Sequence, residues 1–360
     1  MARITLDKLA HSYLPRPRTD ADFALKLIDY VWEDGGAYAL LGPSGCGKTT
    51  LLNIISGLLV PSTGHIRFGD RDVTTLSPET RNIAQVFQFP VIYDTMTVAE
   101  NLAFPLRNRR IEKGEIERRV SDMLDTLDLA DKADRRARGL TADEKQKISL
   151  GRGLVRYDVN AILFDEPLTV IDPHMKWQLR TKLKELHEQF RHTMIYVTHD
   201  QTEALTFADK VVVMYDGEVV QIGTPEELFD EPAHTFVGYF IGSPGMNILP
   251  GRVDGSNVSV AGGDFRLERA WREGGAVEIG IRPEFVRVTD REGAGAAGLP
   301  MQVRAVENVG RQQIVRGSVG GHDIDAVVGE GVPVPAEAFA VFDPARLNVY
   351  RDSHLVRADA

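Results

Sequence analysis

The sequence predicts an α/β domain with a parallel sheet, followed by a small all-β domain. Up to about Gly242, apolar strand segments alternate with helical segments, which is typical of a parallel sheet covered by helices on both faces. After about Ser243, glycine becomes frequent and the predicted strands are short. A chain of 360 residues is too long for one ordinary domain and suits two. We therefore expect one domain at residues 1–242 and a second at residues 243–360.

Four short apolar segments of the first domain have the length and composition of buried strands. They are Tyr38–Leu41, Ala84–Phe87, Ala161–Phe164 and Met194–Val197. The segments between them have helical periodicity: Lys48–Ser56, Glu115–Leu127, Ala142–Val155 and His174–Gln189. Near the end of the domain, Asp216 and Gly217 separate two apolar runs and predict a β-hairpin.

Short strands separated by glycine-rich turns characterise the second domain. The predicted strands are Val277–Ile281, Phe285–Val288, Met301–Val306, Gln313–Arg316 and Leu347–Tyr350. Residues 293–300 are rich in Gly and Ala and are expected to form a loop. This pattern predicts a small barrel or sandwich.

Composition narrows the classes of function. The formal net charge is −10, which disfavours a nucleic-acid partner. No segment approaches the roughly 18 consecutive apolar residues of a membrane-spanning helix, and the first residues lack the apolar core of a signal peptide. Cys46 is the only cysteine, so no intramolecular disulfide can form. We expect a cytoplasmic protein that reaches a membrane only through a partner.

A phosphate-binding loop follows the first predicted buried strand. The motif G-x-x-x-x-G-K-[ST] is matched by Gly42, Pro43, Ser44, Gly45, Cys46, Gly47, Lys48 and Thr49, and Thr50 follows it. Glycines let backbone N–H groups converge on phosphates, and the N-terminus of the next helix adds partial positive charge. Lys48 is placed to contact the β- and γ-phosphates of ATP, and Thr49 to bind Mg²⁺. The chain is thus expected to be a P-loop NTPase.

Two adjacent carboxylates end a second apolar strand. Asp165 and Glu166 follow Ala161–Phe164 directly. In P-loop ATPases the first of two such carboxylates helps to hold Mg²⁺, so Asp165 is a candidate metal ligand. Glu166 is then placed to act as the general base that activates water.

The order of the remaining motifs carries a family resemblance. Residues 85–88 read Gln-Val-Phe-Gln, residues 168–172 read Leu-Thr-Val-Ile-Asp, and residues 198–200 read Thr-His-Asp. Together with the phosphate loop and the acidic pair, this order resembles the nucleotide-binding subunits of ABC transporters over essentially the whole chain. The resemblance implies a RecA-like core, a helical subdomain at about residues 90–157, and ATP with Mg²⁺ as ligands.

The resemblance also implies roles for single residues. Gln88 corresponds to the Q-loop glutamine, which joins Mg²⁺ and the attacking water to the permease contact. Asp172 corresponds to the D-loop aspartate at the dimer interface, and His199 to the switch histidine that holds the γ-phosphate. Tyr13 corresponds to the aromatic side chain that stacks on adenine.

The second domain narrows the resemblance to importers. Residues 242–247 and 280–284 resemble the OB-like regulatory domain of carbohydrate-importer ATPases of the maltose and glycerol-3-phosphate group. Residues 88–96, 139–152 and 172–177 resemble one of the two unequal ATPases of bacterial glycerol importers. This implies uptake of glycerol or a related polyol or carbohydrate. It also implies a second ATPase, two transmembrane permease subunits and an extracellular or periplasmic binding protein as partners, at the cytoplasmic face of the inner membrane.

The signature motif departs from the family. Its usual form is Leu-Ser-Gly-Gly-Gln, and the corresponding residues here are Leu140, Thr141, Ala142, Asp143 and Glu144. Thr141 and Glu144 form the capping-box pattern, which would occupy backbone N–H groups that otherwise face a γ-phosphate. Asp143 adds a like charge that costs on the order of 3 kcal/mol at about 5 Å and a dielectric of about 20, more than the helix dipole, about 1 kcal/mol, offsets.

A poor signature beside intact phosphate-loop and acidic motifs favours a heterodimer with a non-identical ATPase. The alternative is a homodimer that tolerates the variant motif. Two further alternatives are a non-transport ABC ATPase, which would usually carry coiled-coil insertions or paired ATPase domains, and an interaction protein with a vestigial ATPase site. The apolar segment Phe87–Tyr93 with Phe104 lines either a groove for a permease helix or the core.

Overall fold

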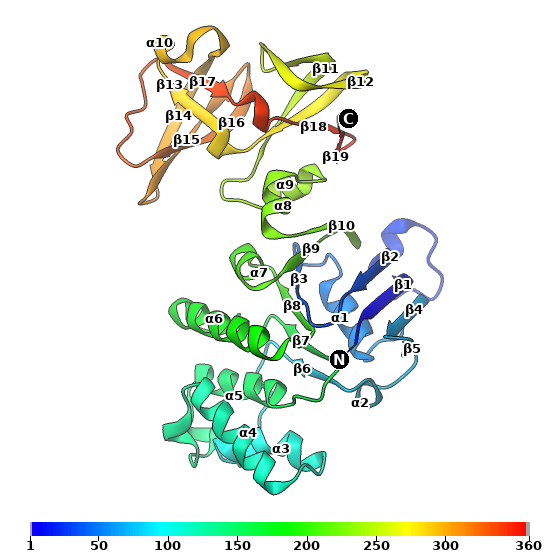
Figure 1. The fold of residues 1–360 in the computed structure, drawn as a ribbon. Helices are drawn as coiled ribbons and strands as arrows, with labels where there is room; N and C mark the ends of the chain where they lie inside the picture. Colours follow the sequence, from blue (N-terminus) through cyan, green and yellow to red (C-terminus); the bar gives the residue numbers. More distant parts are fainter. Residues whose placement is uncertain (1, 358–360) are drawn as a thin grey trace. The chain divides into compact units, whose positions relative to one another are not determined.

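The structure is a computed structural model that describes residues 2–357. Contacts between Cα atoms divide it into two compact units, Met1–Pro225 and Glu226–Ala360. Figure 1 shows the elements of each unit. The division lies before the boundary expected at residues 242 and 243, because residues 226–242 pack on the second unit. The domain limits 1–242 and 243–360 stay a prediction, and Met1 and residues 358–360 lie outside the described residues.

A six-stranded sheet forms the centre of the first unit, with the strand order β10-β9-β3-β8-β7-β6. The strands are β3 (Ala37–Leu41), β6 (Ile83–Val86), β7 (Ala161–Asp165), β8 (Met194–Thr198), β9 (Lys210–Tyr215) and β10 (Glu218–Gly223). The pairs from β9 through β3, β8 and β7 to β6 are parallel, and only β10 is antiparallel. The predicted parallel sheet and hairpin are confirmed; Asp216 and Gly217 both have positive φ, as the two-residue turn requires.

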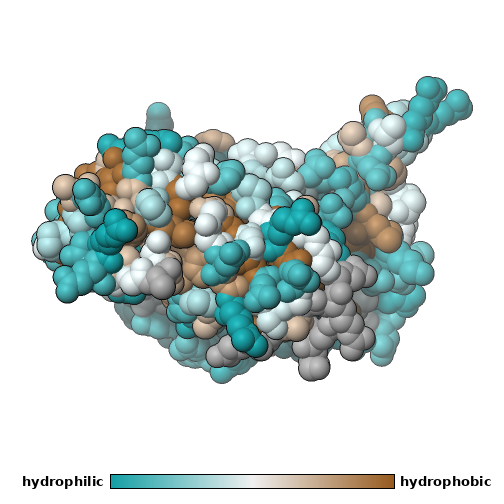
Figure 2. Space-filling view, turned by 90° about the horizontal axis from the view of Figure 1, so that it is seen from above, coloured by the Kyte–Doolittle hydropathy of each residue, from teal (hydrophilic) through white to brown (hydrophobic). Residues whose placement is uncertain are grey.

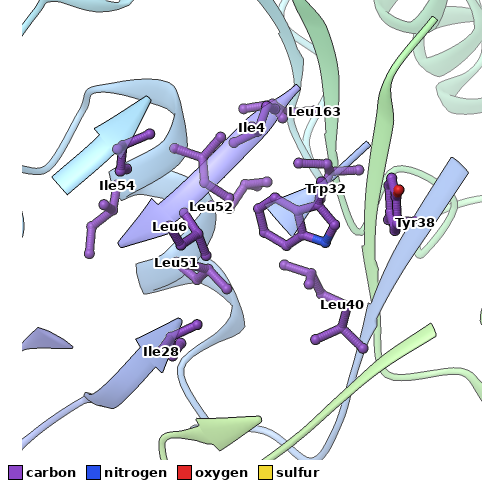
Figure 3. Packing of buried hydrophobic residues seen from close by; sticks show 14 of the residues in the cluster. Ile4, Leu6, Ile28, Trp32, Tyr38, Leu40, Leu51, Leu52, Ile54 and Leu163 are labelled. Carbon is purple, nitrogen blue, oxygen red and sulfur yellow. The ribbon is translucent and has the colours of Figure 1, made fainter. Parts of the chain in front are cut away.

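A second, antiparallel sheet packs on this centre and was not predicted. Its order is β2-β1-β4-β5, formed by β1 (Ile4–His11), β2 (Leu25–Trp32), β4 (Thr63–Phe68) and β5 (Arg71–Asp72). Side chains of β1 and β2 join α1 and the central sheet in one buried cluster. Figure 3 shows Trp32 among Ile4, Leu6, Leu52 and Leu40. This cluster holds the helix of the phosphate loop against two sheets.

The helices of the first unit fall into two groups. The α-helices are α1 (Lys48–Ser56), α2 (Pro78–Arg81), α3 (Val98–Asn108), α4 (Lys113–Thr126), α5 (Ala142–Leu154), α6 (Pro173–Phe190) and α7 (Gln201–Phe207). Short 3₁₀ helices are η1 (Asp20–Asp22), η2 (Ala130–Lys132) and η3 (Ala137–Gly139). Helices α3, α4 and α5 contact one another, and their buried side chains include Leu102, Leu106, Met123 and Ile148. They lie within the region expected to form a helical subdomain.

The second unit contains two antiparallel sheets around one core. The sheets have the orders β11-β12-β18-β19 and β13-β17-β14-β15-β16. The strands are β11 (Asn247–Val260), β12 (Gly263–Ile281), β13 (Val286–Thr289), β14 (Leu299–Asn308), β15 (Gln312–Val319), β16 (His322–Gly329), β17 (Ala338–Phe342), β18 (Asn348–Arg351) and β19 (His354–Leu355). Leu249, Ile279, Val315 and Phe342 belong to their shared buried cluster. The predicted all-β unit is confirmed.

Helical turns complete the second unit. They are α8 (Pro225–Asp230), α9 (Thr235–Phe240), α10 (Arg291–Ala294), η4 (Pro283–Phe285), η5 (Gly295–Ala297) and η6 (Pro344–Arg346). The loop expected at residues 293–300 is wrong in part, since α10 and η5 enter it and β14 begins at Leu299. The reason is local: the side chain of Asp290 accepts a hydrogen bond from Gly293 N at 2.8 Å and caps α10.

One face of the molecule can be followed by its hydropathy. Figure 2 shows a face on which hydrophilic residues lie between small groups of hydrophobic ones. Among the described residues, no helix is both long enough and apolar enough to cross a membrane.

Arg282 binds α8 and α9 to the strands of the second unit. Its side chain is 2% exposed. The guanidinium donates to Leu228 O (3.2 Å), Phe229 O (2.5 Å) and Ile241 O (2.5 Å), and stacks on the Phe229 ring at 3.9 Å. Its five N–H donors suit the carbonyls left open at the ends of two short helices. This contact explains why residues 226–242 group with the β strands.

Replacing Arg282 with methionine is expected to lower the free energy of unfolding of the second unit by about 3 kcal/mol, because several buried carbonyls lose their donors. Differential scanning calorimetry of the full chain checks this. The matched control is Arg287→Met, since Arg287 is exposed and its side chain donates one hydrogen bond, to Gly293 O at 3.2 Å; its effect is expected to stay below about 0.5 kcal/mol. Equal effects of the two substitutions would contradict the role given to Arg282.

Candidate active site

The phosphate loop joins β3 to α1, and two glycines hold its shape. Gly45 has φ +84° and Gly47 has φ +100°, a region that L-residues rarely adopt. A Cβ on Gly47 would also lie 2.6 Å from Ala24 O, so no larger residue fits there. A Cβ on Gly45 would meet no atom within 4 Å, which leaves the outer side of the loop open to a ligand.

The ammonium group of Lys48 lies inside this loop. Lys48 is 6% exposed, and its Nζ donates to Gly42 O at 2.8 Å and Pro43 O at 2.9 Å. Backbone carbonyls, and not a carboxylate, thus hold the charge, so phosphate oxygens could replace them without breaking an ion pair. Cys46 Sγ is 3.7 Å from Nζ, yet burial raises the pKa of the Cys46 thiol. Cys46 is therefore a small, inert part of the loop.

The hydroxyl groups on either side of Lys48 have different surroundings. Thr49 and Ser44 are exposed, whereas Thr50 is buried and exchanges a hydrogen bond of 3.1 Å with the hydroxyl of Tyr13. Tyr13 is 64% exposed, and its ring packs edge-to-face with that of His11, with ring centres 4.7 Å apart. The structure thus places an exposed aromatic ring beside the helix of the phosphate loop.

The acidic pair lies at the carboxyl end of β7. Burial raises the pKa of Asp165, the charge of Glu166 raises it further, and Lys48 opposes both effects. Glu166 has φ +46°, an uncommon conformation for a residue with a side chain. A hydrogen bond from Glu166 N to Val197 O, 3.0 Å long, helps to hold it there. Such strain is found at functional sites when the surroundings enforce it.

Parallel pairing brings His199 to Glu166. Asp165 of β7 pairs with Val197 of β8, so the residues that follow each strand meet at the same edge. His199 Nδ1 lies 3.2 Å from Glu166 Oε2, and Thr169 Oγ1 donates to the same oxygen at 3.3 Å. Gln88 follows β6, in which Val86 pairs with Phe164 of β7, so Gln88 lies at this edge as well.

A buried network supports the loop that carries His199. Thr198 Oγ1 and Tyr196 Oη both donate to Glu203 Oε2, at 2.8 and 3.1 Å. Glu203 is 3% exposed and also pairs with Lys176 of α6 at 3.5 Å. Asp200 N donates to Thr198 Oγ1 at 3.0 Å, which fixes the backbone on both sides of His199. The sequence alone did not single out Glu203.

Asp172 lies at the N-terminus of α6. It is exposed, and its carboxylate accepts a hydrogen bond of 2.9 Å from His174 N, so it caps the helix within its own chain. Its role across a dimer interface stays a prediction.

The altered signature begins α5, and its capping box is confirmed. Thr141 N donates to Glu144 Oε2 at 2.9 Å, and Glu144 N donates to Thr141 Oγ1 at 3.3 Å. Lys132 binds Glu144 at 2.7 Å and, as the main cause, lowers the pKa of the Glu144 carboxyl. Ala142 is exposed and Asp143 is half-buried. The acceptors for two backbone donors therefore come from the chain itself.

Gln146, one turn further along α5, is a site residue that sequence reasoning missed. Its side chain is fully buried, and its Nε2 donates to Phe87 O and Pro167 O. The available signal was an amide at a core-facing position of a predicted helix. Nothing local in the sequence indicates which loops it contacts.

The donors around the loop suit a nucleotide with its metal. Among residues 2–357, no group of three or more His, Cys, Asp or Glu side chains is placed to hold a metal ion. A Mg²⁺ ion retains several waters and commonly binds one or two carboxylates plus substrate phosphates. Asp165 and the hydroxyl of Thr49 fit that pattern, and the open side of the phosphate loop fits the phosphates.

Comparisons with known proteins decide the family. Residues 25–169 match the model of the ABC transporter family, and residues 242–286 match that of the MalK OB fold domain. The chain is 40% identical over 343 residues to the sn-glycerol-3-phosphate import ATP-binding protein UgpC of Ruegeria pomeroyi, covering 95% of this chain and 93% of the relative. The chain belongs to the ABC transporter ATP-binding protein family. It is an ABC-type transport ATPase and binds ATP.

Other relatives carry the same name. The UgpC protein of Jannaschia sp. is 37% identical over 361 residues, with 100% of this chain and 99% of the relative covered. UgpC 3 of Agrobacterium fabrum is 44% identical over 296 residues, covering 82% and 83%. The resemblance to carbohydrate-importer ATPases with an OB-like domain is thus confirmed.

Replacing Asp165 with asparagine is expected to raise the Tm of the nucleotide-free ABC ATPase at pH 7 while it abolishes hydrolysis. The folded pKa of Asp165 lies above the ordinary value of 3.8, so the folded state binds more protons and loses stability as the pH rises through this range. Asparagine removes the buried charge. Thermal denaturation from pH 7 to about pH 4 should show the difference between variant and wild type shrinking as the pH falls.

The exposed residue Asp134 supplies the control, since Asp134→Asn should leave the Tm unchanged. A lower Tm of the Asp165 variant at pH 7 would show that the carboxylate stabilises the fold.

Proposed function

We propose that this chain is the ATP-hydrolysing subunit of an importer for sn-glycerol-3-phosphate or a related polyol. The observation that carries the proposal is the similarity, 37–44% over most of the chain, to proteins named for sn-glycerol-3-phosphate import. The sequence predicted glycerol or a related polyol or carbohydrate, and sn-glycerol-3-phosphate is the phosphate ester of glycerol. A separate permease and a binding protein would complete the importer, with this chain at the cytoplasmic face of the inner membrane.

The nucleotide site is assigned from the residues that converge on one sheet edge. Gly42–Thr50 would cradle the phosphates, with Lys48 exchanging its carbonyl partners for phosphate oxygens. Tyr13 would stack on adenine. Thr49, Asp165 and Gln88 would hold Mg²⁺, which supplies charge neutralisation at the γ-phosphate.

Hydrolysis requires a base and a group that senses the γ-phosphate. Glu166 would accept the proton of the attacking water, and His199, 3.2 Å from it, would donate to the γ-phosphate. The left-handed backbone of Glu166 and the network around Thr198 support fixed positions for both side chains. Asp172, exposed at the start of α6, would face the second ATPase.

The permease would bind beside the Q-loop. Phe87, Phe89, Val91 and Tyr93 are between 39% and 69% exposed. Tyr93 also packs on Phe104, with ring centres 4.5 Å apart. An exposed apolar segment of this kind suits an amphipathic helix. We also propose residues 1–242 as the nucleotide-binding domain and 243–360 as the regulatory domain; the match to the MalK OB fold domain begins at residue 242.

The second ATPase is proposed to be a different protein. The capping box occupies donors that the usual signature presents to the γ-phosphate of the opposing site. Asp143 would add a negative charge there. This chain would therefore contribute one fully active site and would need a signature from a non-identical partner. A homodimer with full turnover is the competing outcome.

The Glu166→Gln variant is expected to bind ATP but to hydrolyse it at least about 100-fold more slowly, because the general base is lost. Single-turnover hydrolysis and filter binding of radiolabelled ATP measure the two effects. Glu188→Gln, an exposed substitution on α6, is the control and should leave both unchanged. Hydrolysis by the Glu166 variant at more than a tenth of the wild-type rate would count against the role of Glu166.

Restoring the usual signature tests the heterodimer. A variant with Ala142→Gly, Asp143→Gly and Glu144→Gln is expected to raise ATP turnover by the chain alone at least about tenfold, since the negative charges of Asp143 and Glu144 no longer oppose the approach of the phosphate. Steady-state ATPase assays of this variant, of wild type and of the control Asp131→Asn provide the comparison. Full turnover by the unaltered chain alone would instead establish the homodimer.

A further inference from the structure

Gln146 connects the two loops that flank the proposed catalytic residues. It lies on α5 and is 0% exposed. Its Nε2 donates to Phe87 O at 3.3 Å and to Pro167 O at 2.7 Å. Phe87 directly precedes Gln88, and Pro167 directly follows Glu166. One amide group therefore joins the backbone of the Q-loop to that of the acidic loop.

The chemistry of the contact requires an amide nitrogen. Both neighbours are carbonyl oxygens, which only accept hydrogen bonds, and the amide NH₂ has two donors, one for each. A glutamate here would place a carboxylate against two carbonyls. The orientation of the Gln146 amide is thus determined by its partners.

The same orientation leaves an oxygen without a partner. Among the described residues, no group hydrogen-bonds to Gln146 Oε1, although the atom is buried. An unpaired buried acceptor costs about 1–3 kcal/mol. An apolar side chain at position 146 would avoid this cost in stability. The amide is therefore explained by the two hydrogen bonds that it donates to the loops.

Two other side chains of α5 contact the segment that follows Gln88. Lys145 binds Asp94 at 3.2 Å, and the Arg152 guanidinium lies 4.8 Å from the centre of the Tyr93 ring and donates to Val91 O. Of these three residues, only Gln146 also reaches the acidic loop. A displacement of the segment Phe87–Asp94 would therefore move Gln146, and through Gln146 the backbone next to Glu166.

We propose that Gln146 is a positioning residue that couples Gln88 to Glu166. It holds the two loops at a fixed separation, so a displacement of the Q-loop changes the place of the general base. Because Gln146 belongs to the helix that begins with the altered signature, it also ties that helix to the chain's own hydrolytic site. This inference rests on the roles proposed above for Gln88 and Glu166.

The test compares Gln146→Met, which retains the volume but removes both donors, with Gln146→Asn, which retains the amide but shortens it by one methylene. Rates of MgATP hydrolysis are measured with the full chain, in whichever state, alone or with its second ATPase, the wild type turns over. For Gln146→Met, kcat should fall at least about tenfold while KM for ATP stays within about twofold, because the phosphate loop is not touched. Gln146→Asn should give an intermediate loss.

Two further measurements separate positioning from simple support of the fold. The control Gln189→Met alters an exposed glutamine of α6 and should leave kcat unchanged. A double-mutant cycle with Gln88→Ala should be non-additive: once Gln88 is removed, Gln146→Met should cost less than about threefold. Additive losses would assign Gln146 a role independent of the Q-loop and would overturn the coupling.

Normal kcat of both Gln146 variants, with Glu166→Gln inactive, would overturn the inference but leave the proposed function standing. Should Gln146→Met fail to fold, Gln146→Asn decides alone by the same cycle. No hydrolysis by the wild type in either state would instead remove the proposed function, and the inference with it.

Discussion

The parallel register of four strands is the constraint on which the site depends. Leu41 of β3 pairs with Thr198 of β8, Asp165 of β7 with Val197 of β8, and Val86 of β6 with Phe164 of β7. Because parallel strands all end at the same edge of a sheet, the phosphate loop, Glu166 and His199 meet there although they are far apart in the chain. The hydrogen bond from Glu166 N to Val197 O extends this register one residue beyond β7.

Several features at this edge favour function over stability. Asp165 is partly buried beside a second carboxylate, and its pKa is raised, so its charged form is disfavoured in the absence of a cation. Glu166 has a left-handed backbone. Gln146 has a buried oxygen to which no group within residues 2–357 hydrogen-bonds. The large buried cluster around Trp32 and α1 provides the rigid support that lets such costs persist.

Helix α5 unites two properties of the chain. At its start, Thr141 and Glu144 form a capping box that supplies hydrogen-bond acceptors for two backbone N–H groups. Lys132 forms an ion pair with Glu144. One turn later, Gln146 faces the interior and donates to the backbone oxygens of Phe87 and Pro167, next to Gln88 and Glu166. Under the proposal above, the helix that begins with the altered signature is therefore attached to the proposed hydrolytic site of the same chain, which is the arrangement proposed for one half of an asymmetric pair.

Sequence by itself determined the features whose chemistry is local. The phosphate loop, the acidic pair, the hairpin at Asp216 and the capping box at Thr141 each need residues a few positions apart, so their spacing was sufficient to predict them. Only the tertiary structure decided features made by distant segments. In the antiparallel sheet of β1, β2, β4 and β5, the pairing of β1 with β4 joins residues as far apart as Ile4 and Phe68, and local spacing does not reveal such a distant partner. In the same way, Arg282 and Gln146 bind backbone carbonyls, and since every residue has a carbonyl, composition and spacing cannot show which ones a buried donor will reach.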